Sequence, residues 1–503
     1  MDSSVLASWI LIILYAAAIL ALVVRGARRN KSVEDYAVGS IAFSPVAVGL
    51  ALAASTTSAA TFIINPGLVA YFGLSAVFGL CVILPISVAG SLVVMTKGFR
   101  KYGQSIKALT LSQWVGERYK SRGFAIFFAV LSLLLVTFIV MILVGLTKVI
   151  AASLALPEPA VLVALVLFSF GYMMFGGANS MVYTNTIQAL IMLLVAFILL
   201  GSGWEHFADG ASGFVERLGT IDEHLTSLYN TNSPLFRDGF EVIFCTIVVG
   251  IAIVCQPHII TKSLLLDNEK DVNRYLLTGA TVQTIFFLVV FVGLYARLEF
   301  PDLLNSAGEA IAPDSVTSTY LVTQFPWFVG VIVFLGLIAA GMSTLEGLIQ
   351  SLSIIITNDL IGNVYAASTG RRIGGSALFR LNRAVIVALA LVSLVLAYQQ
   401  LIAPNLSVII FAQLGVYAYF AAAFVPVFFG TFFEKTPKIA AIAAAVTAVA
   451  VHFALYYTGQ HYFPYFEGVS VKNPGISTAL GIVAAVLVGT VLYFAAGKKS
   501  ARV

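Results

Sequence analysis

Long apolar runs recur along almost the whole of this 503-residue chain and restrict its fold more than any other feature. A membrane-spanning helix needs roughly 20 mostly apolar residues. Because 60% of the residues are hydrophobic and only 10% are charged, the composition excludes a soluble enzyme, a nucleic-acid-binding protein and a disordered regulator. We therefore predict an all-α polytopic membrane protein with 13 transmembrane helices, at 5–25, 42–73, 74–97, 123–152, 158–176, 180–204, 239–261, 275–299, 326–357, 384–402, 405–432, 437–458 and 475–496.

Positive charge is divided unevenly between the two sides of these spans. With the N-terminus placed outside, 23 of the 28 Lys and Arg residues fall on the inner side, Lys262 among them. Because cytoplasmic segments carry an excess of Lys and Arg, we predict a multi-pass protein of the cell membrane (plasma or inner membrane), in contact with lipid, with a cytoplasmic C-terminus. The net charge of +5 follows from this bias and requires no nucleic-acid partner. The outer side holds Arg217, Arg237, Arg297 and Lys472.

The sequence shows no pattern typical of a disulfide framework, a zinc site, an ATP site or an enzymatic domain. Its three cysteines lie in apolar runs, which indicates core residues rather than a disulfide framework or a zinc site. A Gly-rich phosphate-binding loop followed by Lys-Ser/Thr is absent from the sequence, which argues against ATP-driven transport. The loops at 205–238 and 300–325 are too short for an enzymatic domain. We expect no catalytic activity and no cofactor.

The second span is interrupted by polar residues. Ser55-Thr56-Thr57-Ser58 lies at mid-membrane depth, and Pro66-Gly67 follows one or two turns later. In the alternative interpretation the hydroxyls bond back to the helix and the small residues pack against a neighbour. However, four adjacent hydroxyls point all round a helix, whereas packing needs one face. We predict a broken helix whose unwound backbone presents carbonyls to an ion.

Three further spans carry polar groups. The seventh has Gly250 near its middle and Gln256-Pro257-His258 toward its inner end, where the histidine is interpreted as a hydrogen-bonded structural group. The ninth presents small and hydroxyl residues on one face, at Ala340, Ser343, Thr344 and Gly347. The sixth opens with a polar cluster that includes Thr184, Asn185 and Gln188.

These interruptions suit a monovalent cation. By extension from other hard cations, dehydrated sodium takes about five or six oxygens. Carbonyls at the broken second span, opposite Ser343 and Thr344, supply such a set. Glu346 is the only carboxylate clearly inside a predicted span. Because an ionised acid at mid-membrane costs several kcal/mol, we predict a functional role for it.

The chain resembles the sodium/solute symporter family, which includes proline, pantothenate, acetate, sialic acid and sodium/glucose carriers. The matching stretches fall in order over most of residues 35–430, at 58–67, 109–119, 175–188, 256–258 and 342–360. The resemblance implies a leucine-transporter-type arrangement with a five-plus-five inverted repeat. The implied divisions are a leading helix and cytoplasmic link at 1–35, repeats at 42–204 and 239–432, an extracellular loop at 205–238, and two trailing helices with a short tail at 433–503.

Carried over position by position, the resemblance also implies binding residues. The family's sodium site would use the carbonyls of Ala54, Thr57 and Ala340 and the hydroxyls of Ser343 and Thr344. A substrate cavity would lie between the two broken helices. The residues that interrupt these helices are predicted to have structural or gating roles. The substrate-binding candidates are Ser55, Thr56, Ala59, Ala60, Gly250, Ile253 and Gln413, and the gating candidates are Pro66, Gly67, Gln256, Pro257 and His258.

Two departures from the family pattern bear on function. Proline carriers have an acid at the position of Thr56 and aromatics at those of Val249 and Ile253, which weakens a proline assignment. Members with a further cation site use an Asp at the position of Asn185 and a small hydroxyl residue at that of Glu346. In one interpretation the carboxylate has moved across the site, so that Glu346 forms a cation or proton site with Thr184, Asn185 and Gln188. In the other, Glu346 is protonated and donates a hydrogen bond to Asn185.

The resulting expectation is a sodium-coupled symporter that works by alternating access as a functional monomer. Its coupling ion is sodium and its substrate is a small organic solute. The motifs favour a monocarboxylate of the acetate, pyruvate or pantothenate kind. The alternatives are a sodium- or proton-coupled amino acid symporter, or a sensor or channel built on the same bundle.

Overall fold

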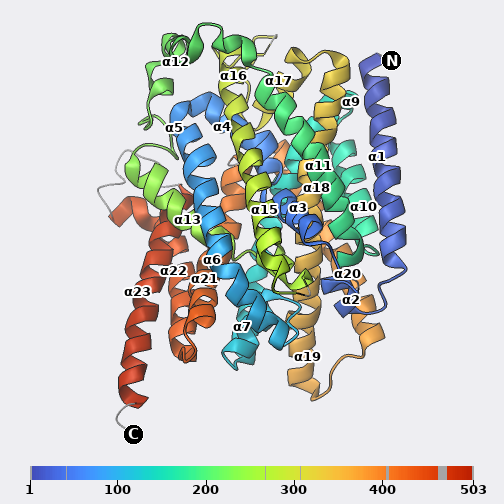
Figure 1. Cartoon of the computed structure of the whole chain (residues 1–503), viewed down its shortest axis with the longest axis vertical. Helices are drawn as coiled ribbons and strands as arrows, with labels where there is room; N and C mark the ends of the chain where they lie inside the picture. The colour runs from blue at the N-terminus through green and yellow to red at the C-terminus, as the bar shows by residue number, and fades with distance from the viewer. Residues whose placement is uncertain are drawn as a thin grey trace.

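The chain folds into a bundle of helices, most of which run roughly along the long axis of the molecule (Figure 1). The computed structural model describes residues 3–40, 42–266, 268–305, 307–403, 407–462 and 473–500, so that Lys472 lies outside the described residues. Helices are expected because a backbone inside a bilayer must satisfy its hydrogen bonds within its own segment.

The first half of the bundle extends as far as the loop helix α12. Its helices are α1 (Ser3–Ala27), α2 (Val33–Val38), α3 (Pro45–Thr56), η1 (Ala60–Ile64), α4 (Asn65–Phe72), α5 (Leu74–Val77), η2 (Phe78–Ile83), α6 (Leu84–Ser105), α7 (Leu111–Arg118), α8 (Arg122–Leu131), η3 (Ser132–Leu135), α9 (Val136–Leu154), α10 (Glu158–Met173), α11 (Ala178–Gly201), η4 (Trp204–Phe207) and α12 (Gly210–Ile221).

The second half begins after a short turn, η5 (Glu223–Thr226), and ends with two long helices. Its elements are η6 (Phe240–Cys245), α13 (Thr246–Ile253), α14 (Pro257–Ile260), η7 (Thr261–Leu265), α15 (Asp271–Leu288), η8 (Val289–Phe291), α16 (Val292–Glu299), η9 (Pro313–Ser315), α17 (Val316–Gln324), α18 (Trp327–Ile354), η10 (Ile355–Ile361), α19 (Gly362–Thr369), α20 (Gly375–Ile402), α21 (Val408–Phe432), α22 (Lys438–Tyr462) and α23 (Pro474–Ser500).

Each of the 13 predicted runs coincides with a helix or with a bent pair of helices. Among the described residues, ten helices are long and apolar enough to cross a membrane, or up to 12 if each bent pair is one span. The pairs are Pro45–Thr56 with Ala60–Phe72, bent by 53°, and Phe240–Ile253 with Pro257–Leu265, bent by 58°. The count of 13 stays a prediction, because it requires the shorter helix Glu158–Met173 to span as well.

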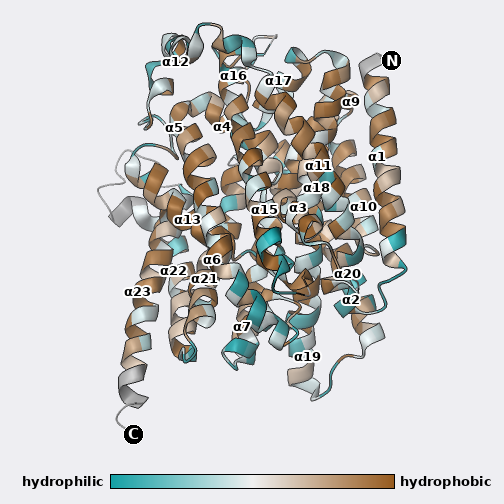
Figure 2. Ribbon diagram, viewed as in Figure 1, coloured by the Kyte–Doolittle hydropathy of each residue, from teal (hydrophilic) through white to brown (hydrophobic). Residues whose placement is uncertain are grey.

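Helix α18 forms the centre of the bundle. Its most apolar window is 72% buried, more than that of any other candidate span among the described residues. It packs against α3, α9, α11 and α14, so both broken spans meet it. Figure 2 shows apolar residues over the middle of the bundle and polar residues gathered near its ends. The chain starts at the end that carries α12, and α23 runs toward the opposite end (Figure 1).

Candidate ion and substrate site

The second apolar run is interrupted at its hydroxyl residues. α3 ends at Thr56, and Thr57 has extended backbone, with φ −106° and ψ 96°. Helical structure resumes at Ala60, whose N–H donates to Ser58 Oγ at 3.1 Å. Because a side chain replaces the missing intrahelical partner here, the unwound stretch is stable within the bundle. The predicted break is confirmed.

Pro66 and Gly67 do not make the bend. Pro66 stands in the first turn of α4, where its missing N–H is tolerated, and the helix continues through it. A Cβ atom on Gly67 would lie 1.9 Å from the carbonyl oxygen of Pro313. Gly67 therefore allows a close approach of η9. The predicted gating role of Pro66 and Gly67 stays a prediction.

The hydroxyl face of α18 lies against the end of α3. Ser343 Oγ donates to the carbonyl oxygens of Ala54, at 2.9 Å, and of Ala340, at 3.0 Å. Thr344 Oγ1 lies 3.3 Å from the Ala54 oxygen and 3.4 Å from that of Ser55. All of these residues are buried. Oxygens from two distant parts of the chain thus converge at mid-bundle, including four of the five predicted sodium ligands.

The fifth predicted ligand, Thr57, follows α3 directly, but its hydroxyl does not point to α18. Its hydroxyl donates to the carbonyl of Ala53 at 2.5 Å, and no described hydrogen bond joins it to α18. Its carbonyl belongs to the extended residue at the break, where a helical partner is lost.

Glu346 lies one turn further along α18 and is fully enclosed by donors. Its carboxylate accepts hydrogen bonds from Tyr172 Oη at 2.7 Å, Thr184 Oγ1 at 2.5 Å and Gln188 Nε2 at 3.0 Å. Gln188 Nε2 also contacts Tyr15 Oη of α1 at 2.8 Å. The structure therefore brings Glu346 together with Thr184 and Gln188, as predicted, and adds two tyrosines.

Asn185 is in the same region but is not joined to Glu346. Its amide nitrogen donates to Ser55 Oγ at 3.2 Å and to the carbonyl of Ser343 at 3.4 Å. The predicted hydrogen bond from a protonated Glu346 to Asn185 is absent from the described contacts. The amide oxygens of Asn185 and Gln188 are buried and have no hydrogen-bond partner among the described residues.

The location of Lys262 differs from the one predicted by the distribution of positive charge. The charge pattern predicts an inner loop at this position, but the second bent pair continues to Leu265, and Lys262 is buried to 2% exposure. Its Nζ has no hydrogen-bond partner among the described residues. Glu346 is the opposite charge that acts on it, although no described ion pair joins the two side chains. A buried ammonium and a buried carboxylate of opposite sign thus belong to one electrostatic unit.

The seventh apolar run breaks at Gln256, as predicted. Gln256 has extended backbone, with φ −67° and ψ 137°, and Pro257 opens α14. His258 is buried, yet both of its ring nitrogens and the Gln256 side-chain oxygen lack hydrogen-bond partners among the described residues. The interpretation of His258 as a hydrogen-bonded structural group was therefore wrong. A Cβ atom on Gly347 would lie 3.4 Å from His258 Cβ and 3.6 Å from Ser55 Oγ, so α18 touches both breaks here.

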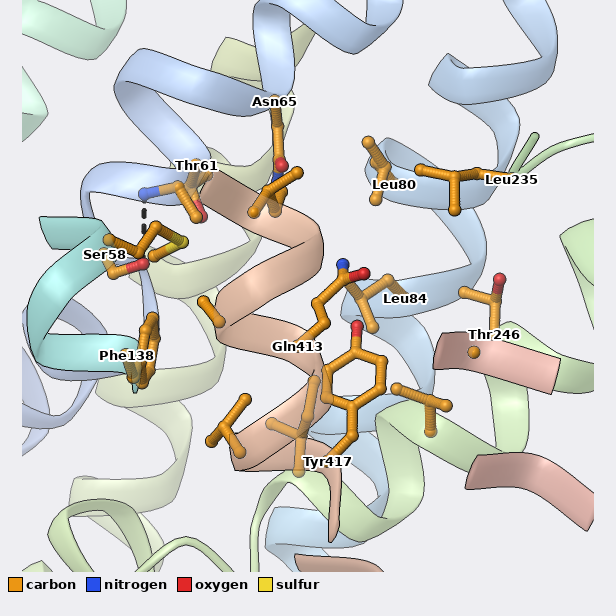
Figure 3. A pocket seen from close by; sticks show the side chains of 18 of the residues that line it. Ser58, Thr61, Asn65, Leu80, Leu84, Phe138, Leu235, Thr246, Gln413 and Tyr417 are labelled. Carbon is orange, nitrogen blue, oxygen red and sulfur yellow. Dashed lines mark hydrogen bonds between the residues drawn. The ribbon is translucent and has the colours of Figure 1, made fainter. Parts of the chain in front are cut away.

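A cavity of about 1140 Å³, its open mouth included, lies beside both breaks. Figure 3 shows Gln413 and Tyr417 projecting from α21 toward Leu84 of α6, with Ser58, Thr61 and Asn65 from the first broken span around the same space. Of the predicted substrate residues, five line it: Ser55, Thr56, Ala60, Ile253 and Gln413.

Two predicted substrate residues are not among those that line the cavity. A Cβ atom on Gly250 would lie 2.6 Å from Ser87 Cβ, so Gly250 permits α13 to pack closely against α6. Ala59 is fully buried, and its Cβ faces Gly145 of α9. Both small residues therefore serve helix packing.

Several residues that line the cavity are not among the predicted substrate residues. Ser58, Thr61 and Asn65 follow the spacing i, i+3, i+7, which identifies one helical face and could have indicated them. Gln256 and His258 also line the cavity, although they were assigned gating roles. Glu241, a buried carboxylate that accepts a hydrogen bond from Arg237 Nε at 2.8 Å, also lines the cavity. Phe138 and Tyr417 carry no sequence signal of this kind.

Comparison with known proteins agrees with this architecture. The sequence model of the sodium:solute symporter family matches residues 36–447. The sodium/pantothenate symporter of Escherichia coli (strain K12) is 27% identical over 444 residues, covering 85% of this chain and 86% of the relative. A high-affinity proline transporter of Bacillus subtilis (strain 168) is 22% identical over 84% of this chain and 86% of its own length.

Structural similarity extends over nearly the entire chain. A solved structure of a Na⁺-coupled sialic acid symporter, described as substrate-bound and outward-open with a novel Na⁺ site, superposes with a TM-score of 0.76. It is 17% identical, with 96% of this chain and 97% of that one covered, so it supports the fold. With the family match over residues 36–447, we conclude that this chain belongs to the sodium:solute symporter family, whose members are membrane transporters rather than enzymes.

Proposed function

We propose that this protein imports a small monocarboxylate together with sodium, by alternating access, and that sodium binds where α18 meets the break after α3. The observation that supports this most strongly is the convergence of Ser343 Oγ and Thr344 Oγ1 on the carbonyl of Ala54. Neutral oxygens suffice for a monovalent cation. The proposed ligands are the carbonyls of Ala54, Thr57 and Ala340 and the hydroxyls of Ser343 and Thr344.

The proposed ion site would couple two mechanical elements. Sodium bound between α3 and α18 favours the arrangement in which the substrate cavity is complete, and its release on the inner side lets the bundle return. Each positive charge carried inward gains about 2.3 kcal/mol per 100 mV. At a potential of roughly 150 mV this amounts to about 3.5 kcal/mol, or about 300-fold solute accumulation. One coupled ion is therefore sufficient for uptake.

The lining of the cavity supports an anionic solute that carries a polar chain. His258 offers ring nitrogens without partners, and Ser58 and Thr61 offer hydroxyls at the restart of the helix after the break. Amide and hydroxyl groups at a helix start favour anions. The 27% identity to a sodium/pantothenate symporter agrees with this assignment. The proposed substrate class is a carboxylate of acetate-to-pantothenate type, with proline-like amino acids as the second class to test.

Glu346 is proposed as a second cation or proton site. Its three neutral hydrogen-bond donors and the unpartnered amide oxygens of Asn185 and Gln188 provide a polar shell next to the sodium ligands. Lys262 supplies an opposing charge from the broken seventh span. A cation or proton entering here would change the balance between these two buried charges.

The proposed function also implies a particular order of helices and a particular orientation in the membrane. Two inverted repeats are proposed at 42–204 and 239–432, each of which would begin with one of the two bent pairs. We further propose two trailing helices after the repeats, an N-terminus on the outside and a C-terminus in the cytoplasm. The functional unit is proposed to be a monomer.

Uptake by purified protein in proteoliposomes tests the proposal. The panel contains labelled acetate, pyruvate, pantothenate and proline, each with and without an inward sodium gradient. Saturable uptake of a carboxylate that rises with the gradient would support it. Sodium-driven uptake of proline alone would transfer the assignment to an amino acid, and non-saturating flux indifferent to sodium would indicate a channel.

A further inference from the structure

A cluster of metal-ligating side chains lies away from the ion and substrate site, at the end of the bundle that carries α12. Glu205 and His206 belong to η4, directly after α11, and Glu299 is the last residue of α16. One potential ligand atom from each residue lies within 4.8 Å of the others. The two helices come from different halves of the chain, so the cluster bridges both halves.

The distance between His206 and Glu299 fits a shared cation better than a direct hydrogen bond. His206 Nε2 lies 3.4 Å from Glu299 Oε1, longer than the roughly 2.7–3.2 Å of ordinary N–H···O bonds. Zinc holds histidine nitrogen and carboxylate oxygen at about 2.0–2.2 Å, so two ligands on a tetrahedral ion stand about 3.4 Å apart. The observed separation equals that ligand–ligand distance.

Both of these side chains are held in place by residues outside the cluster. His206 is 92% buried (8% exposed), its ring packs 5.8 Å from that of Tyr295, and its carbonyl accepts a hydrogen bond from Arg217. Gln324 Nε2 donates to Glu299 Oε2 at 2.5 Å, which leaves Oε1 facing the imidazole. Such outer hydrogen bonds orient the ligands of metal sites. Glu205 is exposed and leaves the cluster accessible.

We propose that Glu205, His206 and Glu299 form a transition-metal site, best suited to Zn²⁺, that joins the end of α11 to the end of α16. Histidine nitrogen and carboxylate oxygen are both zinc ligands, and three protein ligands with a fourth position open to water complete a tetrahedral site. Calcium and magnesium prefer all-oxygen sites, and zinc ranks above manganese and iron for mixed nitrogen and oxygen ligands. The inference is independent of the substrate and of sodium coupling.

The test uses the full chain, purified in detergent and stripped with chelator, with Zn²⁺ alone as the probe. The parent should show a saturable rise in melting midpoint, and Co²⁺ in place of Zn²⁺ should give the visible bands of a four-coordinate site. His206→Ala should abolish both signals. Gln324→Leu, which removes only the outer support, should weaken the apparent affinity about 10- to 100-fold.

Two further variants keep the result interpretable. Glu205→Gln changes an exposed side chain, so it tests the site even if His206→Ala fails to fold, and it should weaken binding at least tenfold. His224→Ala, which alters a histidine of η5 outside the cluster, should leave both signals unchanged. Equal zinc shifts in the parent, His206→Ala and Glu205→Gln, or no shift in the parent, would overturn the proposal and leave a simple His206–Glu299 ion pair.

Discussion

The hydroxyl of Ser343 donates a hydrogen bond of 2.9 Å to the carbonyl of Ala54, across 289 residues of sequence. This bond joins α18, the most buried of the candidate membrane spans among the described residues, to the end of α3 at the break. Because Ala54 lies in the last turn of α3, its carbonyl has lost the partner that a continuing helix would provide. The proposed sodium site depends on that freed oxygen.

Glu346→Gln should change ion coupling while keeping the shape of the side chain. If Glu346 carries a second cation or a proton, the variant should move less charge per solute, or lose part of the pH dependence of uptake. The measurement is the ratio of charge to solute in proteoliposomes at several pH values. An unchanged ratio together with an unchanged pH profile would remove Glu346 from coupling.

Tyr172→Phe is the matched control for that experiment. It removes one donor to the carboxylate, the 2.7 Å bond, and leaves the charge in place. It should therefore retain the parent's charge ratio. A loss of coupling equal to that of Glu346→Gln would show that disturbed packing, rather than the charge, is responsible.

Lys262 and Glu346 should be energetically coupled. Removing either charge alone leaves the other buried without its opposing charge, which destabilises the fold. Lys262→Met combined with Glu346→Gln should therefore cost less than the sum of the single changes, by about 0.5–3 kcal/mol. Thermal unfolding in detergent of all four proteins provides the cycle, and strictly additive effects would show that the two charges act independently.

His258→Asn should weaken carboxylate uptake specifically. His258 lines the cavity, and its two buried ring nitrogens have no hydrogen-bond partner among the described residues, so an anionic group that reaches them could accept a hydrogen bond. We expect a KM for the carboxylate raised about tenfold, the loss of one charge-assisted bond, with the sodium dependence unchanged. Ile253→Val, which trims an apolar lining residue, should leave the KM within about twofold. A parent-like KM in His258→Asn would contradict the assigned role.

Gly293→Ala should destabilise the fold far more than Gly90→Ala. A Cβ atom on Gly293 would lie 2.0 Å from the carbonyl oxygen of Pro66, whereas one on Gly90 would meet nothing within 4 Å. Overpacking of this kind costs about 1–3 kcal/mol. Melting midpoints of the two variants measure the difference, and equal midpoints would show that α4 and α16 do not pack as described.

The sequence predicted the two breaks because local chemistry causes them. At one break the hydroxyl of Ser58 accepts the N–H of Ala60 in place of a helical carbonyl, and Gln256-Pro257 imposes an extended residue at the other. The hydroxyl pair on α18 was predictable for a similar reason, because helical spacing alone places Ser343 and Thr344 on one face.

The remaining parts of the site depend on tertiary packing. Tyr172 reaches Glu346 across 174 residues, and no local pattern encodes that contact. Lys262 was counted as a loop charge because the helix extends four residues beyond the apolar run, to Leu265. Gly250 and Ala59 were assigned to the cavity because a small residue near a break suits a binding site and helix packing equally well.

Sodium binding by the purified protein tests the central claim most directly. Titration calorimetry with NaCl, against an equal ionic strength of choline chloride, should give saturable binding in the parent. Ser343→Ala should weaken that binding about tenfold or more, whereas Ser353→Ala, which removes a buried hydroxyl of α18 bonded to Gln350, should leave it unchanged. Equal sodium affinity in the parent and in Ser343→Ala would contradict the proposed ion site.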